Sequence, residues 1–449
     1  MWPYCLHQPK PSGEMPRPRK ASVPRLLPGM LALLLAVMWG LPDAAAQADS
    51  RAAQIETARQ EKSKHLQPDR SSKMERGLVA LKERKLLERA STGIGGLRVK
   101  LGGLVQGGGF ALGPEYLRRD LAHGNLVFRS AAQSSLRAYQ RYDVQFSAPH
   151  FAKDTLFFDL FAVHHDYPGI NYYGLGPESK KSWRSNFRII DTAIDGIFGL
   201  QPVKHLKVGA SGGYLLVTLG TGKDRRFVST DAQSCVACTD KVFTPPPVGI
   251  DTRPDFVRVG GFVRYDYRDN PGGPRSGGDY LVQLDRYDAR PHTGNDFRRL
   301  NIELAQYIPF FNQRRVIALH ARSVLTYPDN GDVVPFYLQP VLGGSEDLRG
   351  FRAFRFYDNN LIVVNGEYRW EVFSGLDMAL FADSGKVFHR HADWNLRNME
   401  AAFGFGFRFN VRNNVFLRID TGFSHEGFEV WFKFNNVFGE ERIRSSSFQ

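Results

Sequence analysis

Residues 341–351 read Val-Leu-Gly-Gly-Ser-Glu-Asp-Leu-Arg-Gly-Phe and set one arginine between bulky apolar neighbours. The stretch is too polar and too rich in glycine to continue a β-strand. Downstream, Glu367 and Asp383 each lie inside a segment of alternating apolar and polar residues. A guanidinium group can bind a carboxylate through two parallel hydrogen bonds, and a pair shielded from water holds a loop better than an exposed pair. We predict that Arg349 is a latch that folds back between these strands inside a β-barrel.

The composition favours many strands and tight turns over helical domains. The chain of 449 residues contains 34 Phe, 17 Tyr and 44 Gly but only 7 Met, which fits a β protein. A mean hydropathy of -0.34 and the lack of repeated long apolar runs exclude a multi-helix membrane protein. They do not exclude a membrane barrel, because the strands of such a barrel are only half apolar.

The formal net charge is +13, and part of it lies in the N-terminal region. The remaining basic residues are scattered through the expected strands rather than gathered into a run. Such a distribution can line a pore or meet anionic lipid head groups. The sequence has no nucleic-acid-binding motif, so we expect lipid partners and no nucleic-acid partner.

The first 46 residues are typical of an export signal. Five basic residues precede an uncharged run from Leu26 to Pro42, and Ala44-Ala45-Ala46 then offers small residues for cleavage before Gln47. The alternative is an uncleaved anchor helix, but the apolar run is short for a membrane span. We therefore predict a signal peptide over residues 1–46.

A short periplasmic segment is expected over residues 47–94, which are polar and charged. Met74, Leu78 and Leu81 recur at helical spacing, which predicts an amphipathic helix near residues 72–90, with a solvated flexible arm as the alternative. Neither interpretation leaves room for a compact folded domain in this segment.

Cysteine is scarce in the expected mature chain. Whether translation starts at Met1 or at Met15, cleavage leaves only Cys235 and Cys238. A Cys-x-x-Cys pair can be a redox centre, half of a zinc site or a small disulfide. No second Cys or His pair at zinc-finger spacing lies nearby, and an exported chain meets oxidising conditions, so we expect a local disulfide.

From residue 95 the hydrophobic pattern has a period of two, which indicates β-strands. Eleven strands are expected before the arginine, near residues 97–105, 109–119, 126–133, 136–147, 156–166, 187–200, 206–219, 257–268, 279–287, 298–308 and 315–326. Five more follow with clearer alternation, near residues 362–371, 377–383, 403–409, 415–424 and 428–435. In the first two of these five, Glu367 and Asp383 fall on the polar face, opposite apolar residues such as Val364 and Leu380.

A water-soluble β-sandwich would alternate in the same way, but two features favour a barrel in lipid. Many expected strands reach ten residues, near the length that a tilted membrane strand needs. Short turns such as 310–313 are interleaved with long connections such as 220–255 and 327–356. We predict an all-β, antiparallel transmembrane barrel of sixteen strands over residues 95–438. Both of its ends should lie on the periplasmic side, and one loop should be inserted into its lumen.

These residues resemble a known family. From about Gly95 to Phe438 the chain is similar to the outer-membrane barrel of the BamA/TamA surface-antigen superfamily, which includes bacterial assembly factors and two-partner secretion transporters. The resemblance rests on Leu348-Arg349-Gly350-Phe351, on Glu367 and on Phe381-x-Asp383-x-Gly385, with agreement at Gly107-Gly108-Gly109-Phe110 and Tyr173-Gly174-Leu175-Gly176-Pro177. It implies that the Arg349 loop enters the lumen and pairs with Asp383, with Glu367 as a second partner.

Two departures from the family pattern bear on function. Family members usually carry periplasmic POTRA repeats before the barrel, and residues 47–94 are too short for even one. A separate periplasmic subunit would be expected if such repeats are supplied in trans. The family's barrel usually ends at a terminal aromatic residue, whereas residues 439–449 follow Phe438 here. We expect the recognition signal of the last strand to run to Phe438, followed by a short tail.

The sequence offers little for covalent or metal chemistry. His164 and His165 are neighbours on an expected strand, where adjacent side chains face opposite sides and cannot share one ion without distortion. Ser424 and His425 adjoin in the same way beside Asp420. We therefore expect no enzyme activity, no metal and no cofactor.

A barrel of this kind in the bacterial outer membrane is expected to move or insert a cargo: an outer-membrane protein, a secreted polypeptide or a lipid. The expected weak seam lies between the first and last strands, where Gly102 and Gly103 reduce strand pairing and packing. A seam that opens sideways can template an incoming strand by edge pairing. The alternatives are a passive or structural pore without translocase activity and a barrel lipid hydrolase.

Overall fold

The computed structural model describes residues 95–152, 155–230, 247, 249–250, 254–411, 414–434 and 438. The predicted signal peptide, the predicted periplasmic segment 47–94, the Cys235 and Cys238 pair and the tail 439–449 lie outside the described residues. Within the described part of the chain, no helix is long and apolar enough to cross a membrane.

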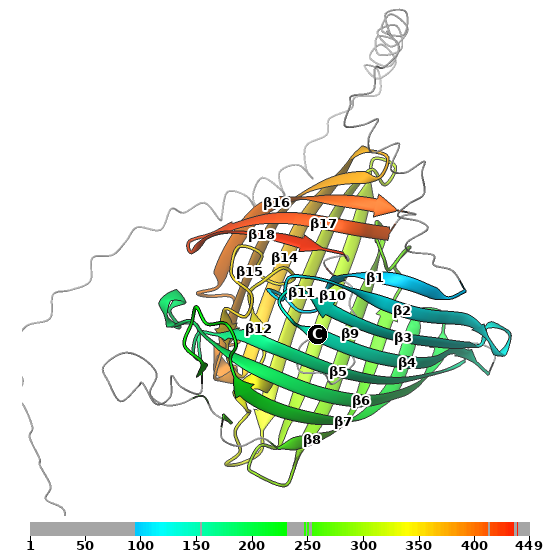
Figure 1. Cartoon of the computed structure of the whole chain (residues 1–449). Coiled ribbons are helices and arrows are strands. Elements are labelled where there is room, and N and C mark those ends of the chain that lie inside the picture. Colours follow the sequence, from blue (N-terminus) through cyan, green and yellow to red (C-terminus); the bar gives the residue numbers. More distant parts are fainter. Residues whose placement is uncertain are drawn as a thin grey trace, which may run out of the picture. The chain divides into compact units, whose positions relative to one another are not determined.

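Sixteen strands form a single antiparallel sheet that curls into a nearly closed barrel (Figure 1). They are β1 (Leu97–Gly103), β2 (Phe110–Leu121), β3 (Leu126–Ser135), β4 (Gln140–Phe151), β5 (Leu156–Tyr172), β6 (Ser185–Val203), β7 (Leu206–Thr221), β8 (Asp255–Asp266), β9 (Gly277–Arg290), β10 (Phe297–Phe310), β11 (Arg315–Pro328), β14 (Asn360–Phe373), β15 (Leu376–Phe388), β16 (Glu400–Val411), β17 (Asn414–Ser424) and β18 (Gly427–Lys433). Two short strands, β12 (Val341–Leu342) and β13 (Phe356–Tyr357), pair separately. The prediction of an all-β, sixteen-stranded antiparallel barrel is confirmed.

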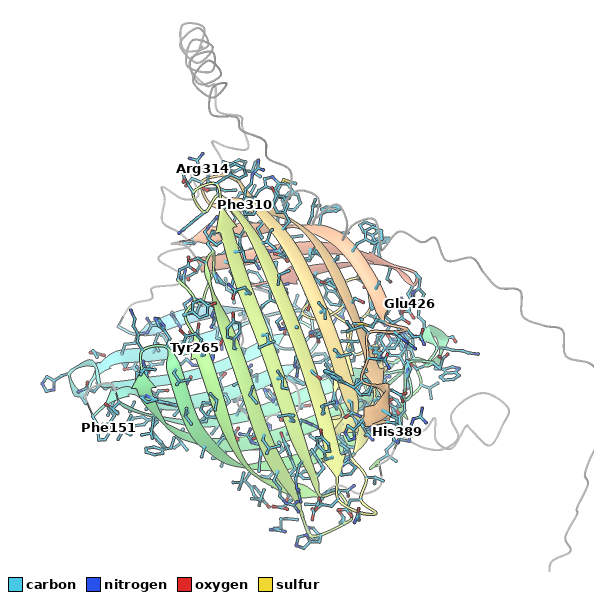
Figure 2. All side chains as sticks on the ribbon, turned by 180° about the vertical axis from the view of Figure 1, so that it is seen from behind. Phe151, Tyr265, Phe310, Arg314, His389 and Glu426 are labelled. Carbon is cyan, nitrogen blue, oxygen red and sulfur yellow. The ribbon has the colours of Figure 1, made fainter. Side chains whose placement is uncertain are left out.

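The connections alternate between the two ends of the strands. One end carries short turns, among them residues 204–205, 311–314 and 374–375, and we call it the short-turn end. The other, the long-loop end, carries residues 329–359 between β11 and β14. Figure 2 shows Phe310 and Arg314 at the short-turn end, well away from His389 and Glu426.

Alternating side chains give each strand one face toward lipid and one toward the lumen. On β14, Val364 is 41% exposed whereas Glu367 is 2% exposed. On β16, Phe403 is 65% exposed whereas Arg408 is 1% exposed. Large apolar side chains therefore cover the outside of the barrel, and charged side chains pair with one another on its inner wall.

β5 is longer than the predicted strand at residues 156–166, because it continues through Pro168 and Gly169. Its ladder with β6 shifts register between Tyr167 and Ile170. Such an irregularity lets proline and glycine stay inside a strand. The sequence pattern alone ends the strand too early because a Pro-Gly pair is typical of a turn.

The connection between β11 and β14, residues 329–359, turns back into the barrel, and we call it the lumen loop. Its Phe336 packs edge-on against Tyr172 and Phe187, with ring centroids 5.2 and 4.9 Å apart. Tyr357 packs on the same Tyr172 with centroids 5.1 Å apart. These aromatic side chains belong to one large buried cluster with the inner wall, so the lumen loop packs on the wall near the long-loop end.

β1 and β18 form the two edges of the sheet, and we call the gap between them the seam. β1 pairs with β2 and β18 pairs with β17, and among the described residues no hydrogen-bonded ladder joins the two edges. Both edge strands are short, with 7 residues each, against 12 in β2 and 11 in β17. The rings of Phe110 and Phe434 meet at the seam with centroids 5.6 Å apart. Gly102 and Gly103 end β1 beside this contact.

Candidate functional site

The lumen loop brings Arg349 against the middle of β14 and β15. The Arg349 Nε and Nη2 atoms donate to Asp383 Oδ2 and Oδ1 over 2.9 and 2.8 Å. Its Nη1 atom donates to Glu367 Oε2 over 2.6 Å. All three side chains are fully buried. The structure thus places Arg349 against both carboxylates that the sequence analysis named as its partners.

Further contacts fix the guanidinium group. The Arg349 backbone N–H donates to Asp383 Oδ2 over 3.1 Å, and the Asn365 amide donates to Asp383 Oδ1 over 2.8 Å. The Phe381 ring centroid lies 3.5 Å from Arg349 Cζ, which is a cation–π contact. Burial disfavours the cation, but the carboxylates of Asp383 and Glu367 outweigh that effect, so the pKa of Arg349 lies above its ordinary value.

The neighbours of Arg349 seat the loop on the wall. Leu348 and Phe351 are fully buried. Both belong to an apolar cluster with Val324, Leu342, Phe356, Leu361, Val363, Val387 and Ala402. Gly385 makes room for this packing, because a Cβ there would stand 3.0 Å from Leu342 Cδ2. The motif residues around the arginine therefore position it through apolar packing.

Gly350 lies at backbone contact distance from β17. A Cβ on Gly350 would stand 2.6 Å from the Phe423 carbonyl oxygen, and a Cβ on Gly422 would stand 2.3 Å from the Arg349 carbonyl oxygen. The Ser424 hydroxyl donates to the Gly350 carbonyl over 2.7 Å. Two glycines thus let the loop and the strand touch. The sequence analysis did not identify Gly422, because nothing local marks a glycine that another segment approaches.

Four more buried residues extend the ion pairs across the wall. Glu367 also accepts hydrogen bonds from Arg369 over 2.6 Å and from Arg408 over 2.9 Å. Asp420 accepts from Arg408 over 2.5 Å and from Arg418 over 2.9 Å. Strand alternation puts these side chains on the polar face. The register, which is the pairing of residues between neighbouring strands, brings them into contact. We call the full set the charge cluster: Arg349, Glu367, Arg369, Asp383, Arg408, Arg418 and Asp420.

The lumen loop also contacts both sides of the seam. On one side, the Trp431 indole N–H of β18 donates to the Arg349 carbonyl over 2.8 Å. On the other side, a Cβ on Gly107, in the turn after β1, would stand 3.7 Å from the Ala353 Cβ. The residue that reaches the charge cluster is therefore bonded to an edge strand of the seam, a link that the sequence analysis missed.

Replacing Trp431 by phenylalanine is expected to loosen the lumen loop from β18. The ring can keep its packing, but the Arg349 carbonyl loses its donor, which costs about 1 kcal/mol. Hydrogen exchange read by mass spectrometry should become faster in residues 345–355 and in β18. Trp394→Phe, which removes an indole hydrogen bond to Ser323, is the matched control. Equal exchange in the two variants would contradict a stabilising role for the Trp431 contact.

Phe438 lies inside the barrel. β18 ends at Lys433, two residues before the predicted end of the last strand at residue 435. The Phe438 ring stacks on His320 with centroids 4.6 Å apart, and its carbonyl accepts from the Tyr307 hydroxyl over 3.0 Å. Residues of β10 and β11 form a socket for the ring: Ala305, Tyr307, Val316 and Ala318. An apolar ring gains more from this socket than from a solvated strand end.

The histidine and serine candidates do not converge on a reactive centre. His165 Nδ1 lies 3.2 Å from Asp191 Oδ2 on the inner wall, whereas His164 contacts Thr192 on the outer face. The Ser424 hydroxyl is engaged by the Gly350 carbonyl. The described residues contain no group of three His, Cys, Asp or Glu side chains that could hold a metal ion.

Comparisons with known proteins identify the superfamily of the barrel domain. Residues 127–424 match the Omp85 superfamily domain. The fold is similar to that of BamA from Haemophilus ducreyi lacking POTRA domains 1-3, with a TM-score of 0.56 and 14% identity over 76% of this chain and 69% of that chain. CdiB from Escherichia coli aligns with a TM-score of 0.48 and 13% identity over 76% of this chain and 62% of that chain. A comparison with curated proteins found no match. Because the superfamily domain spans most of the barrel, the chain belongs to the Omp85 superfamily of outer-membrane β-barrels.

Proposed function

We propose that this Omp85-superfamily barrel inserts or translocates a polypeptide at the bacterial outer membrane through the seam. The observation that carries the proposal is the pair of edges that β1 and β18 present to each other without a ladder among the described residues. The N–H and C=O groups of a strand edge can pair with an incoming extended chain. A sideways opening would then pass that chain from the lumen into the lipid.

The lumen loop supports a seam whose opening is controlled. The charge cluster holds Arg349 to the wall at β14 and β15, and Trp431 ties the same residue to β18. A movement of β18 away from β1 therefore pulls on a loop that is anchored by buried ion pairs. We infer that the charge cluster sets the resting position of the seam.

Two alternatives fit less well. A passive pore needs an open lumen, but aromatic residues of the lumen loop pack inside the barrel near the long-loop end. A lipid hydrolase needs a reactive serine, and barrels of the Omp85 superfamily are generally transporters or assembly factors rather than enzymes. We further propose that a separate periplasmic subunit delivers the client to the short-turn end, where β1 begins and β18 ends.

A disulfide across the seam is expected to abolish the activity. A Cβ on Gly102 would stand 3.9 Å from the Phe434 Cβ, within the range of about 3.5–4.5 Å that a disulfide requires. The G102C/F434C variant, with Cys235 and Cys238 changed to serine, should therefore lock when oxidised. Cells that depend on it should lose the client from the outer membrane, and dithiothreitol should restore it.

The client itself is identified by comparing the outer-membrane proteome and lipid content of cells with and without the protein.

The control for the seam disulfide is T421C/V430C, which joins paired residues of β17 and β18. This disulfide lies within the sheet and does not cross the seam, so it should leave activity intact. Full activity of the locked seam would overturn the proposal, as would a cell without the protein whose outer membrane is unchanged. Altered lipids with unchanged proteins would assign the cargo to lipid instead.

A further inference from the structure

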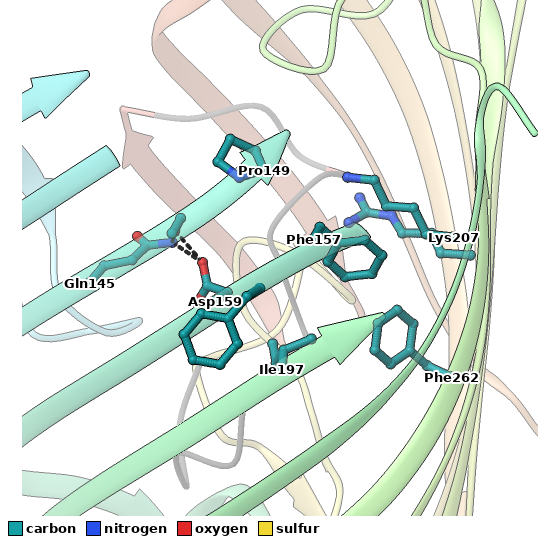
Figure 3. A pocket seen from close by; sticks show the side chains of 10 residues that line it. Gln145, Pro149, Phe157, Asp159, Ile197, Lys207 and Phe262 are labelled. Atoms are coloured by element: carbon teal, nitrogen blue, oxygen red, sulfur yellow. Dashed lines mark hydrogen bonds between the residues drawn. The ribbon is translucent and has the colours of Figure 1, made fainter. Parts of the chain in front are cut away.

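A cavity of about 200 Å³ opens on the inner wall over β4 to β8 (Figure 3). Its lining residues Phe157, Lys207 and Phe262 lie close to the ends of their strands at the short-turn end. In the strand order the cavity is separated by β9 to β11 from the wall that carries the charge cluster. It therefore belongs neither to the seam nor to the Arg349 contacts.

One side of the cavity is apolar. Ile197 and Phe262 are 7% and 4% exposed and belong to one small buried cluster, against which Phe157 packs. The Phe157 and Phe262 ring centroids lie 6.3 Å apart. Both rings lie close over glycines, since a Cβ on Gly199 would stand 2.4 Å from Phe157 Cζ and one on Gly209 would stand 2.9 Å from Phe262 Cζ. The two glycines let the rings lie against the wall and keep the cavity open.

The rim of the cavity carries positive charge. Lys207 is exposed. Asp159, a carboxylate that also lines the cavity, accepts hydrogen bonds from the Gln145 amide over 2.6 Å and from the Ser147 hydroxyl over 2.5 Å. The Lys207 Nζ lies 5.3 Å from the Phe157 ring centroid, so the charge sits beside the apolar floor. The other cation at the rim, Arg264, is already held by Asp279 through two hydrogen bonds of 2.9 and 2.8 Å.

We propose that this cavity binds a single-chain anionic amphiphile of the lipid class. The carboxylate or phosphate head pairs with Lys207, and the hydrocarbon chain lies on Phe157, Ile197 and Phe262. A charge-assisted hydrogen bond fixes the head, and burial of the chain supplies the rest of the affinity. A lipid fits better than a peptide for a topological reason. β4 to β8 are each paired on both sides, so the wall has no free edge with which a peptide backbone could form a ladder.

The test uses the full chain in a neutral maltoside micelle, with native mass spectrometry to count bound molecules. The probes are dodecanoate and dodecyl phosphate, which separate a carboxylate from a phosphate source, and dodecyltrimethylammonium, which carries the opposite charge. We expect both anions to bind with one dominant site and the cation to bind far more weakly. Lys207→Gln should weaken the anions by about tenfold, as for the loss of one hydrogen bond to a charged group.

Two further variants separate the site from general surface charge. Lys204→Gln removes an exposed lysine in the adjacent turn and should leave binding unchanged. Ile197→Phe places a ring in the cavity and should remove binding of both anions while the barrel keeps its heat-dependent shift on gels. Equal binding of the cationic probe, or unchanged anion binding in Lys207→Gln, would overturn the proposal. If neither dodecanoate nor dodecyl phosphate binds, but a peptide carboxylate binds in a manner that depends on Lys207, the cavity is a peptide site and the lipid proposal is wrong.

Discussion

Replacing Arg349 by methionine is expected to lower the free energy of unfolding of the barrel by about 3–5 kcal/mol. The substitution keeps an unbranched side chain of similar length but removes the cation between Asp383 and Glu367. Glu367 still receives hydrogen bonds from Arg369 and Arg408, so Asp383 is affected most. Either its carboxylate stays buried without a cation, which is costly, or the lumen loop withdraws and admits water.

Urea unfolding in lipid vesicles, followed by tryptophan fluorescence, measures this loss. Arg349→Lys keeps the charge but cannot form two parallel hydrogen bonds to one carboxylate, so an intermediate loss is expected. Arg226→Met removes an exposed pair with Asp224 and should cost less than about 1 kcal/mol, as is usual for surface ion pairs. Wild-type stability of Arg349→Met would show that the buried pair is not a latch.

Gly422→Ala is expected to drive the lumen loop away from β17 without altering any charged residue. The new Cβ would stand 2.3 Å from the Arg349 carbonyl oxygen and 2.7 Å from the Gly350 nitrogen. Both are backbone atoms, so the clash can be relieved only by moving the loop or the strand. Overpacking of this kind costs about 1–3 kcal/mol, and it also weakens the contacts of Arg349 by displacing the residue that carries them.

Trypsin added to intact cells reports the position of the loop, because Arg349 and Arg355 are buried and must be exposed before they can be cleaved. Faster cleavage within the lumen loop is expected for Gly422→Ala. Gly366→Ala on β14 is the control, since the nearest atom to a Cβ there is the Ala382 carbonyl oxygen at 4.0 Å. If both variants are cleaved as slowly as the wild type, the loop does not depend on its close approach to β17.

The amino-acid sequence alone determined which residues lie on the apolar face and which on the polar face of each strand. Alternation with a period of two is a local property, so it separated Glu367 and Asp383 from Val364 and Leu380 without any knowledge of the fold. The same alternation placed Arg408, Arg418 and Asp420 on the polar face. The glycine-rich stretch around Arg349 was recognisable as a loop because it breaks that period, and the type of its charged residue named the carboxylates as partners.

Only the tertiary structure decided which of these side chains meet. Arg408 and Arg418 are direct cross-strand partners, and Asp420 bridges two like charges that would otherwise repel one another. Register depends on hydrogen bonds between strands and on irregularities such as the one after Tyr167 in β5, and these are not visible in the side-chain pattern. The pairing of Arg408 with Glu367, and of Arg408 and Arg418 with Asp420, therefore could not be read from spacing.

The contacts of the seam were also beyond the sequence. Trp431 alternates as any half-buried strand residue does, and its bond to the Arg349 carbonyl exists because the lumen loop passes β18. Phe438 is an aromatic residue of the kind expected at the end of the last strand's recognition signal. Its ring nevertheless lies among side chains of β10 and β11. Alternation of apolar and polar residues shows to which face of a strand a side chain belongs. The path of a loop or of a chain end depends instead on the spaces that remain between distant strands once the barrel has formed.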